Sequence, residues 1–353
     1  MSLIASLPVS TNAVARRRWC EAMLPRVSRT FAACIGLLPR GLRHPVLLAY
    51  LLCRIADTIE DTADLPVADK ERLLAHLRAC LDEDGGDAAP LAAAFAAARD
   101  DDEALTRDAD AVLAEYRALP ALQRGAIRPW VQEMCDGMAA FARAHAQARP
   151  GRLDALGSVE DLDRYCYYVA GTVGHLLTEL FRLHHRRVTP RHYQRLKALS
   201  TSFGLGLQLT NIIKDVVDDR RRGWSFVPQQ LCQLAGITPD DLCDPAHAER
   251  ARAVMTQLIA KARAHLDDAL AYCLALPRSQ YRIRLFCLTP LYFAVRTLRL
   301  AAGDPRLLDP GHKVKITRPE VYRTIRMTFL VAPNNHLVRW YYRALAGPGP
   351  SAH

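Results

Sequence analysis

The stretch AYLLCRIADTIEDTAD, residues 49–64, starts as an apolar helical segment and ends in a run of carboxylates. Spacings of four, three and four residues place one set of side chains on a single stripe of a helix, namely Tyr50, Arg54, Asp57 and Asp61, with Glu60 beside them. Like charges one helical turn apart repel by about 0.2–0.5 kcal/mol per pair. A carboxylate stripe that emerges from an apolar helix therefore needs cations. Mg²⁺ prefers such oxygen ligands together with phosphates.

A second stretch repeats this pattern far downstream, in GLGLQLTNIIKDVVDDRRRGW, residues 204–224. Spacings of three, four and four align Gln208, Asn211, Asp215 and Asp219, while the apolar residues between them fill the other faces of the predicted helix. One such stripe alone is typical of a solvated helix surface. Two stripes that face each other across a helical bundle would hold several Mg²⁺ ions and a diphosphate, and this is the arrangement that we expect.

Helix signals recur along the whole chain. The segment GSVEDLDRYCYYVAGTVGHLLTELFRLHH, residues 157–185, opens with Ser158 and Asp161 in capping-box spacing and predicts one long helix. TPRHYQRLKALS (189–200) and TPDDL (238–242) each predict a helix with a Thr cap and Pro at its first position. Alternating runs of the strand type are hard to find. We therefore predict an all-α protein.

The chain organisation predicted from composition is a single domain. We expect an N-terminal segment over residues 1–20, one helical domain over 21–345 and a flexible tail over 346–353. Residues 81–110 are rich in Ala, Gly and Asp, which favours a surface excursion with one Ala-rich helix.

The composition excludes several classes of protein. The 353 residues are 50% apolar and carry a formal charge of +10, which suits nucleic acid, anionic lipid or a polyphosphate substrate. Basic motifs with interleaved aromatic residues are missing, so we expect no nucleic-acid partner. No apolar run approaches the ~20 residues of a membrane span. The ten cysteines show no paired spacing, which indicates reduced thiols in a cytoplasmic protein.

Five blocks of this sequence, in order between about residues 25 and 325, resemble one family. DTIED (57–61) and NIIKDVVDD (211–219) are similar to the two aspartate-rich motifs of the squalene/phytoene synthase family of head-to-head prenyltransferases. Three further blocks resemble its squalene synthase branch: SRTFAACIGLLP (28–39), YCYYVAGTVGHLLTELF (165–181), and LFCLTP (285–290) with VKITRPE (314–320). The resemblance implies one isoprenoid synthase helical bundle with a central substrate cavity.

The resemblance also implies roles for individual residues. The expected Mg²⁺ ligands are Asp57, Glu60, Asp61, Asn211, Asp215 and Asp219. The diphosphate of the ionising substrate would be held by Ser28, Arg29, Tyr50 and Arg54. A hydrophobic tunnel would be lined by Tyr165, Val169, Val173, Leu176, Leu180, Phe31, Leu207, Phe286 and Cys287, where Gly171 and Gly174 leave room, and Gln208 would also bind substrate. By helical period alone, the stripe from Tyr165 to Leu180 is typical of an ordinary core. Tyr165 corresponds to a tyrosine that helps to remove a proton; the alternative is a tyrosine packed in a core.

The implied reaction condenses two farnesyl diphosphates to presqualene diphosphate, which NADPH then reduces to squalene. Lys315 is the candidate contact for NADPH, and no glycine-rich nucleotide loop is present. Trp224 stands where the family usually has an arginine, and Lys214 stands where squalene synthases usually have one. The product alternatives are therefore presqualene diphosphate, hydroxysqualene and dehydrosqualene.

Two further functions remain open alternatives. A phytoene synthase-type enzyme would use geranylgeranyl diphosphate instead. A catalytically inactive assembly factor of the same fold is disfavoured, because Asp57, Asp61, Asp215 and Asp219 are all present. We expect no C-terminal membrane anchor in YYRALAGPGPSAH, a monomer, and peripheral contact with anionic membrane at the cytoplasmic face.

Overall fold

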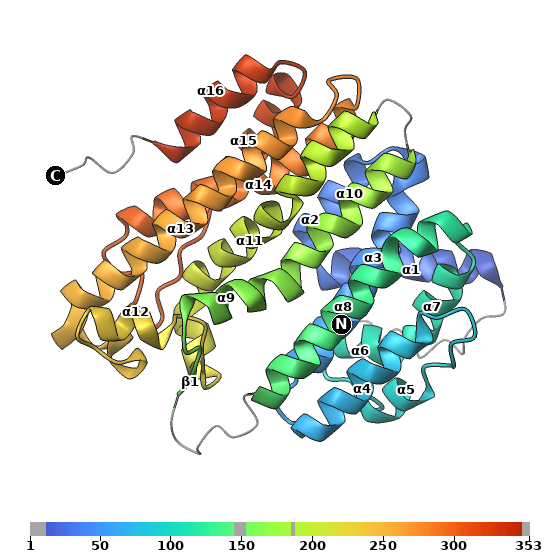
Figure 1. Cartoon of the computed structure of the whole chain (residues 1–353), viewed down its shortest axis with the longest axis horizontal. Helices are drawn as coiled ribbons and strands as arrows, with labels where there is room; N and C mark the ends of the chain where they lie inside the picture. The colour runs from blue at the N-terminus through green and yellow to red at the C-terminus, as the bar shows by residue number, and fades with distance from the viewer. Residues whose placement is uncertain (1–11, 145–152, 185–187, 348–353) are drawn as a thin grey trace. The chain divides into compact units, whose positions relative to one another are not determined.

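The computed structural model describes residues 12–144, 153–184 and 188–347 (Figure 1). The chain divides into two compact units. Unit 1 comprises Met1–Ala146 and His175–Arg186, and unit 2 comprises Gln147–Gly174 and Arg187–His353. Both units are helical. Strand structure in the described residues consists of one two-residue parallel pair, β1 with β2. The all-α prediction is confirmed.

The described residues of unit 1 form eight helices and most of a ninth. They are α1 (Ala13–Val27), α2 (Arg29–Leu37), α3 (Arg40–Asp61), α4 (Val67–Cys80), α5 (Ala89–Ala94), α6 (Asp101–Arg107), α7 (Ala109–Arg117), α8 (Ala121–Ala144) and, from His175 onward, α10 (Thr172–His184).

Helix α3 forms the centre of unit 1. It packs against α1, α2, α4, α6, α7 and α8. Leu51, Leu52, Ile55 and Ile59 are fully buried on it. A helix that is apolar on several faces gains most of its stability from such packing rather than from intrinsic propensity. The packing therefore fixes the position of the polar stripe that the same helix carries.

The segment 81–110 differs from the prediction of a surface excursion with one helix. It folds as α5 and α6 and leads into α7, and Leu91, Phe95 and Leu105 are buried. Asp100 caps α6, because its side chain accepts a hydrogen bond from the backbone N–H of Glu103. Helix α6 packs against α3, so this segment belongs to the core of unit 1.

Unit 2 contains the remaining elements. They are β1 (Asp154–Ala155), α9 (Val159–Cys166), the π-helical turn η1 (Tyr167–Gly171), the start of α10, α11 (Pro190–Arg221), β2 (Trp224–Ser225), α12 (Gln229–Leu234), the 3₁₀ turns η2 (Pro239–Cys243) and η3 (Pro245–His247), α13 (Ala248–Ala275), α14 (Tyr281–Gly303), α15 (Arg318–Val331) and α16 (Asn335–Ala346).

The predicted long helix from Ser158 is broken by a π turn. The capping box of Ser158 and Asp161 is confirmed, but α9 ends at Cys166 and α10 begins only after η1. A π turn shifts the side-chain register, so residues before and after it no longer share one α-helical stripe. The predicted tunnel stripe is thus divided: Tyr165 lies before the turn, Val169 within it, and Val173, Leu176 and Leu180 after it.

Glycines allow α11 to approach this segment closely. A Cβ atom at Gly204 would lie 2.2 Å from the carbonyl oxygen of Ala170, and one at Gly174 would lie 2.1 Å from that of Ser200. Neither position has space for a side chain. The predicted room beside Gly174 is therefore filled by the backbone of α11 and is not part of a cavity.

The other predicted helix starts are confirmed with one change. Thr189 caps α11 with Pro190 at the first position, as predicted. Thr238 and Asp241 form a capping box, but the element that follows is the short 3₁₀ turn η2 and not an α-helix.

Helix α14 is the apolar core of unit 2. By length and composition this helix could cross a membrane, although the sequence showed no apolar run long enough. However, 72% of its apolar window is buried inside the structure. The Arg284 side chain on this helix is fully buried. Its guanidinium donates to the carbonyl oxygens of Cys273, Leu276 and Ala332 and to Asn335 Oδ1, at 2.7–3.0 Å. Arg284 thereby ties the end of α13 and the α15–α16 turn to α14.

All ten cysteines lie within the described residues, and none forms a disulfide; nine are buried, and Cys243 is half-buried. Most of the predicted N-terminal segment (residues 1–11) and of the tail (348–353) lies outside the described residues.

Candidate active site

The polar stripe of α3 lies on one face of that helix in unit 1, as its spacing predicts. Arg54 Nη2 donates a hydrogen bond of 2.9 Å to the Tyr50 hydroxyl, and its guanidinium also lies over the Tyr50 ring. The ring of Phe31 on α2 lies 5.4 Å from that of Tyr50, between centroids. Phe31, Tyr50 and Arg54, which were predicted to bind substrate, therefore form one contiguous group.

The carboxylates of α3 lie in a setting that disfavours their charge. Burial raises the pKa of Asp57 to about 7, with Asp61 and Asp102 adding to the shift and Arg54 opposing it. Burial also raises the pKa of Glu60 well above its usual value, and the charges of Asp61 and Asp57 raise it further. Carboxylates that repel one another in a desolvated setting fit divalent cations. The residues present thus suit Mg²⁺.

Two residues near this stripe were not predicted. Asp102 on α6 places Oδ1 at 3.8 Å from Arg54 Nε, too far for a hydrogen bond, and both atoms are buried without a hydrogen-bond partner. Lys70 on α4 is buried, and its ammonium donates to the carbonyl oxygen of Glu60 at 2.5 Å. Neither residue lies in a recognisable motif. Only the packing of α4 and α6 on α3 brings them to the stripe.

Ser28 and Arg29 lie at the start of α2. The Ser28 hydroxyl accepts a hydrogen bond of 3.2 Å from the backbone N–H of Phe31 and caps the helix. Arg29 is exposed. Ser28 therefore has a structural role in addition to the predicted contact with diphosphate, while the guanidinium of Arg29 is accessible to a ligand.

The polar stripe of α11 lies in unit 2, and its carboxylates form ion pairs with lysine and arginine side chains. The Lys214 ammonium pairs with Asp215, and Arg222 pairs with Asp219. Lys313 reaches the same helix from the segment before α15 and lies 3.4 Å from Asp215 and 2.5 Å from Asp218. This contact holds the pKa of Asp218 below its usual range. Asn211 is exposed and Gln208 is half-buried.

The lysine that contacts this acidic stripe is Lys313, which was not predicted; Lys315 stays a predicted contact for NADPH. Lys315 is exposed, two residues further along the VKIT block. The arginines after the second motif also have clear partners, because Arg221 lies 3.5 Å from Asp218 while Arg222 binds Asp219. Each of these arginines therefore neutralises a carboxylate near the end of α11.

A row of stacked aromatic rings connects Tyr165 to Trp224, the residue that stands where an arginine was expected. The ring of Tyr165 stacks on Phe226 with centroids 4.7 Å apart, and Phe226 stacks on Trp224 with centroids 6.4 Å apart. Tyr165 is 7% exposed. Phe226 was not predicted, and its place directly after β2 accounts for the contact, since β2 pairs with β1 just before α9.

The remaining predicted wall residues are divided between exposed and buried settings. Val169, Val173 and Leu207 are half-buried, whereas Phe286 and Cys287 are buried on α14. Helices α9 and α14 and the η1 turn all pack against α11. These elements therefore give the α11 stripe an apolar flank within unit 2. Leu176 and Leu180 belong to unit 1 and are buried there.

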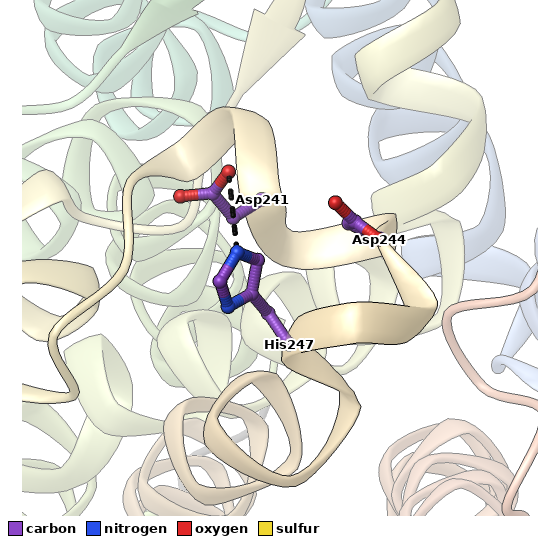
Figure 2. A group of neighbouring side chains, drawn as sticks. All are labelled: Asp241, Asp244 and His247. Carbon is purple, nitrogen blue, oxygen red and sulfur yellow. Dashed lines mark ion pairs between the residues drawn. The ribbon is translucent and has the colours of Figure 1, made fainter.

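A third group of metal-ligating residue types lies at η2 and η3 in unit 2. Figure 2 shows Asp241, Asp244 and His247, with His247 Nε2 4.0 Å from Asp241 Oδ1. One oxygen of Asp241 accepts from the N–H and hydroxyl of Thr238, and one oxygen of Asp244 accepts from the Ala246 N–H. These bonds explain the two carboxylates as caps of η2 and η3. We assign no metal to them.

With the geometry in hand, comparison with known proteins identifies the family. The family model for squalene/phytoene synthase matches residues 24–320. The chain belongs to the squalene/phytoene synthase family. All five sequence blocks lie within the matched range, so the predicted resemblance is confirmed.

Individual members of the family agree with this assignment. The squalene synthase of Schizosaccharomyces pombe is 31% identical over 301 residues, which is 84% of this chain and 62% of that protein. The mouse squalene synthase is 29% identical and is matched over 84% of this chain and 66% of its own length. The chain thus spans less than two thirds of the length of these relatives.

Solved structures support the fold of this family member. A complex of TcSQS with the ligand BPH1237 aligns with a TM-score of 0.78 and 26% identity over 96% of this chain and 94% of that one. A dehydrosqualene synthase in complex with a ligand aligns with a TM-score of 0.61 at 17% identity, over 91% of this chain and 98% of that one. The predicted isoprenoid synthase fold is confirmed.

Proposed function

We propose that this protein joins two molecules of farnesyl diphosphate head to head and reduces the product to squalene. The first step would form presqualene diphosphate and release pyrophosphate and a proton. The second would consume NADPH and release NADP⁺ and the second pyrophosphate. We also propose that it acts as a monomer in the cytoplasm, where its ten cysteines would stay reduced.

One observation carries this proposal. The chain keeps both acidic stripes of a family whose model matches it over residues 24–320, and the α3 stripe includes an arginine whose Nε atom is buried without a hydrogen-bond acceptor. A diphosphate supplies anionic acceptors of the kind that this arginine lacks. Retention of the carboxylates and of Arg54 argues against an inactive assembly factor.

Arg54 and Tyr50 are proposed to bind the departing diphosphate. Their mutual hydrogen bond orients the guanidinium, and the Phe31 ring packs near the Tyr50 ring. Negative charge on the leaving group grows as the allylic carbon–oxygen bond breaks. Donors already in place stabilise that growing charge more than the ground state and so lower the barrier.

The two stripes are the proposed metal ligands, with Asp57, Glu60 and Asp61 on α3 and Asn211, Asp215 and Asp219 on α11. Bound Mg²⁺ would neutralise phosphate oxygens at each stripe. On α11, Lys214 and Lys313 already occupy part of the negative field. Their flexible ammonium groups suit a role in which they move from the carboxylates to the diphosphate.

Tyr165 is proposed to help to remove the proton lost on ring closure. It is buried and stacked on Phe226, so its hydroxyl position is restricted. The half-buried side chains of Val169, Val173 and Leu207 lack nucleophiles, which suits the wall of a site that must protect a carbocation from water. Phe286 and Cys287 are proposed to extend that wall.

The proposed test is incubation of the purified protein with farnesyl diphosphate and Mg²⁺, with and without NADPH, followed by product identification. We expect presqualene diphosphate without NADPH and squalene with it. Product that remains presqualene diphosphate, hydroxysqualene or dehydrosqualene in the presence of NADPH would reject squalene as the product. Consumption of geranylgeranyl diphosphate in place of farnesyl diphosphate would reject the proposed substrate.

A further inference from the structure

Helices α15 and α16 form a hairpin that exposes large apolar side chains. Among the described residues, nine large hydrophobic side chains are exposed, and five of them lie on these two helices: Tyr322, Phe329, Leu330, Leu337 and Trp340. Tyr322, Leu330 and Trp340 are 67%, 68% and 56% exposed. Single exposed apolar residues are ordinary, but a group on adjacent helices marks an interaction surface.

The hairpin presents these residues on one side. Thr324, Thr328 and Val331 of α15 and Val338, Tyr341, Tyr342 and Leu345 of α16 are buried. Both helices pack on α14 and on each other (Figure 1). The ring of Tyr341 lies edge-on to Tyr292 of α14, with centroids 4.9 Å apart. Because both buried faces are turned to α14, both exposed faces are turned away from it.

The same side carries a strong positive charge. Residues 318–346 hold five arginines and one acidic residue, Glu320, for a formal charge of +4. Glu320 is bound by Arg296 of α14 at 2.6 Å, which withdraws its charge from the surface. Arg323, Arg326, Arg339 and Arg343 are exposed beside the apolar side chains. Arginine, tryptophan, tyrosine and leucine together are typical of surfaces that insert into lipid headgroups.

The hairpin is also held rigidly. The Tyr281 hydroxyl donates to the carbonyl oxygen of Phe329 at 2.9 Å, and the Tyr292 hydroxyl donates to that of Val338 at 3.2 Å. Arg284 binds Ala332 and Asn335 in the turn. The exposed face can therefore bind a flat surface with little loss of conformational entropy.

We propose that the outer face of the α15–α16 hairpin docks this protein onto anionic lipid bilayers. We call it the docking face, defined by the five apolar residues and four arginines named above. Its charge favours lipid phosphates over a second copy of the chain, because two such faces would repel each other. Basic residues near an anionic surface and apolar side chains in the headgroup region then add their contributions.

Vesicle binding by the full chain, measured without substrate, tests this proposal separately from the enzymatic one. We expect salt-sensitive co-sedimentation with phosphatidylcholine vesicles that contain phosphatidylglycerol, and much weaker binding to phosphatidylcholine alone. The triple variant Tyr322→Ser, Leu330→Ser, Trp340→Ser should lower the partition coefficient about 10- to 100-fold. The matched control, Val14→Ser, Leu122→Ser, Leu234→Ser, removes apolar groups that are 58%, 73% and 75% exposed and should bind like the wild type.

Separate variants test the preference for anionic lipid and the depth to which Trp340 inserts. Replacing Arg323, Arg326, Arg339 and Arg343 with Gln should abolish the preference for phosphatidylglycerol, whereas the same change at the exposed Arg18, Arg40, Arg191 and Arg195 should keep it. Brominated lipid should quench the fluorescence of Trp340, and Trp340→Phe should remove that quenching while vesicles still bind. Circular dichroism of each variant confirms folding.

Three results would overturn the proposal. The first is wild-type protein that does not bind phosphatidylglycerol vesicles at low salt. The second is equal loss of binding in the docking-face variant and its matched control. The third is a concentration-dependent dimer that the docking-face variant abolishes while vesicle binding stays unchanged, since the face would then join two copies of the chain.

Discussion

Helices α3 and α11 carry nearly the same polar pattern and stabilise it differently. On α3 the burial of Asp57 and Glu60 and the charge of the exposed Asp61 raise the pKa values of Asp57 and Glu60. On α11 the carboxylates bind Lys214, Lys313, Arg221 and Arg222, and the pKa of Asp218 is lowered. The comparison teaches that spacing predicts a shared face, while the charge state of that face depends on its neighbours.

The largest effect on activity is expected from the carboxylates of the α3 and α11 stripes. Asp57→Asn on α3 and Asp215→Asn on α11 should each lower the turnover of farnesyl diphosphate by at least ~1,000-fold, since each removes a proposed metal ligand. Circular dichroism and Tm should stay close to wild type. Asp218→Asn is the control, because Asp218 lies beside the α11 stripe but is not a proposed metal ligand, and it should retain activity. Full activity in both test variants would reject the metal assignment.

The second prediction concerns how closely α11 packs on its neighbour η1. Gly204→Ala would place a methyl group 2.2 Å from the carbonyl oxygen of Ala170, so α11 must move away from η1. We expect the free energy of unfolding to fall by roughly 3 kcal/mol or more, as for severe overpacking. Gly125→Ala in α8 meets nothing within 4 Å and should raise stability by about 0.5–1 kcal/mol. Equal Tm values for both variants would contradict the close packing.

The third prediction concerns the buried cation beside the α3 carboxylates. Lys70→Met keeps the length of the side chain but leaves the Glu60 carbonyl oxygen without its donor. Stability should fall by about 1–3 kcal/mol, measured by urea denaturation. Arg72→Met on the same helix removes an exposed ion pair with Asp69 and should change stability by less than ~0.5 kcal/mol.

The smallest effect is expected at Lys313, the exposed lysine that contacts the carboxylates of α11. Lys313→Met should lower stability by only about 0.5 kcal/mol without Mg²⁺, because the ion pairs are solvent-accessible. The increase in Tm on adding Mg²⁺ should be larger than in the wild type, because the lysine no longer competes for Asp215. Lys315→Met is the matched control, and an identical Mg²⁺ response in the two variants would contradict the competition.

The local features of the fold could be predicted from the sequence. The stripes on α3 and α11 follow from residue spacing, and the Ser158 and Thr189 caps follow from short motifs. Such features depend on residues within one or two turns of each other, which a single sequence displays directly. The family resemblance added the fold of the bundle, which spacing alone left open.

The features that sequence reasoning missed depend on long-range packing. Asp102, Lys70 and Lys313 come from elements distant in the chain, and no motif marks them. The π turn at Tyr167–Gly171 accompanies the backbone contact between Gly204 and Ala170, a tertiary contact that overrides local helical period. The segment 81–110 looked polar because its buried residues, such as Leu91 and Leu105, are few and widely spaced.

The fully buried Arg284 has a consequence for the order in which unit 2 assembles during synthesis. Two of its four acceptors, the carbonyl oxygens of Cys273 and Leu276, precede it in the chain, whereas those of Ala332 and Asn335 lie some 50 positions later. A ribosome-bound chain that has released α14 but not α16 must therefore leave part of this guanidinium to water, and α14 cannot fully close onto its neighbours. Completion of the apolar core of unit 2 is thus coupled to the arrival of the last helix.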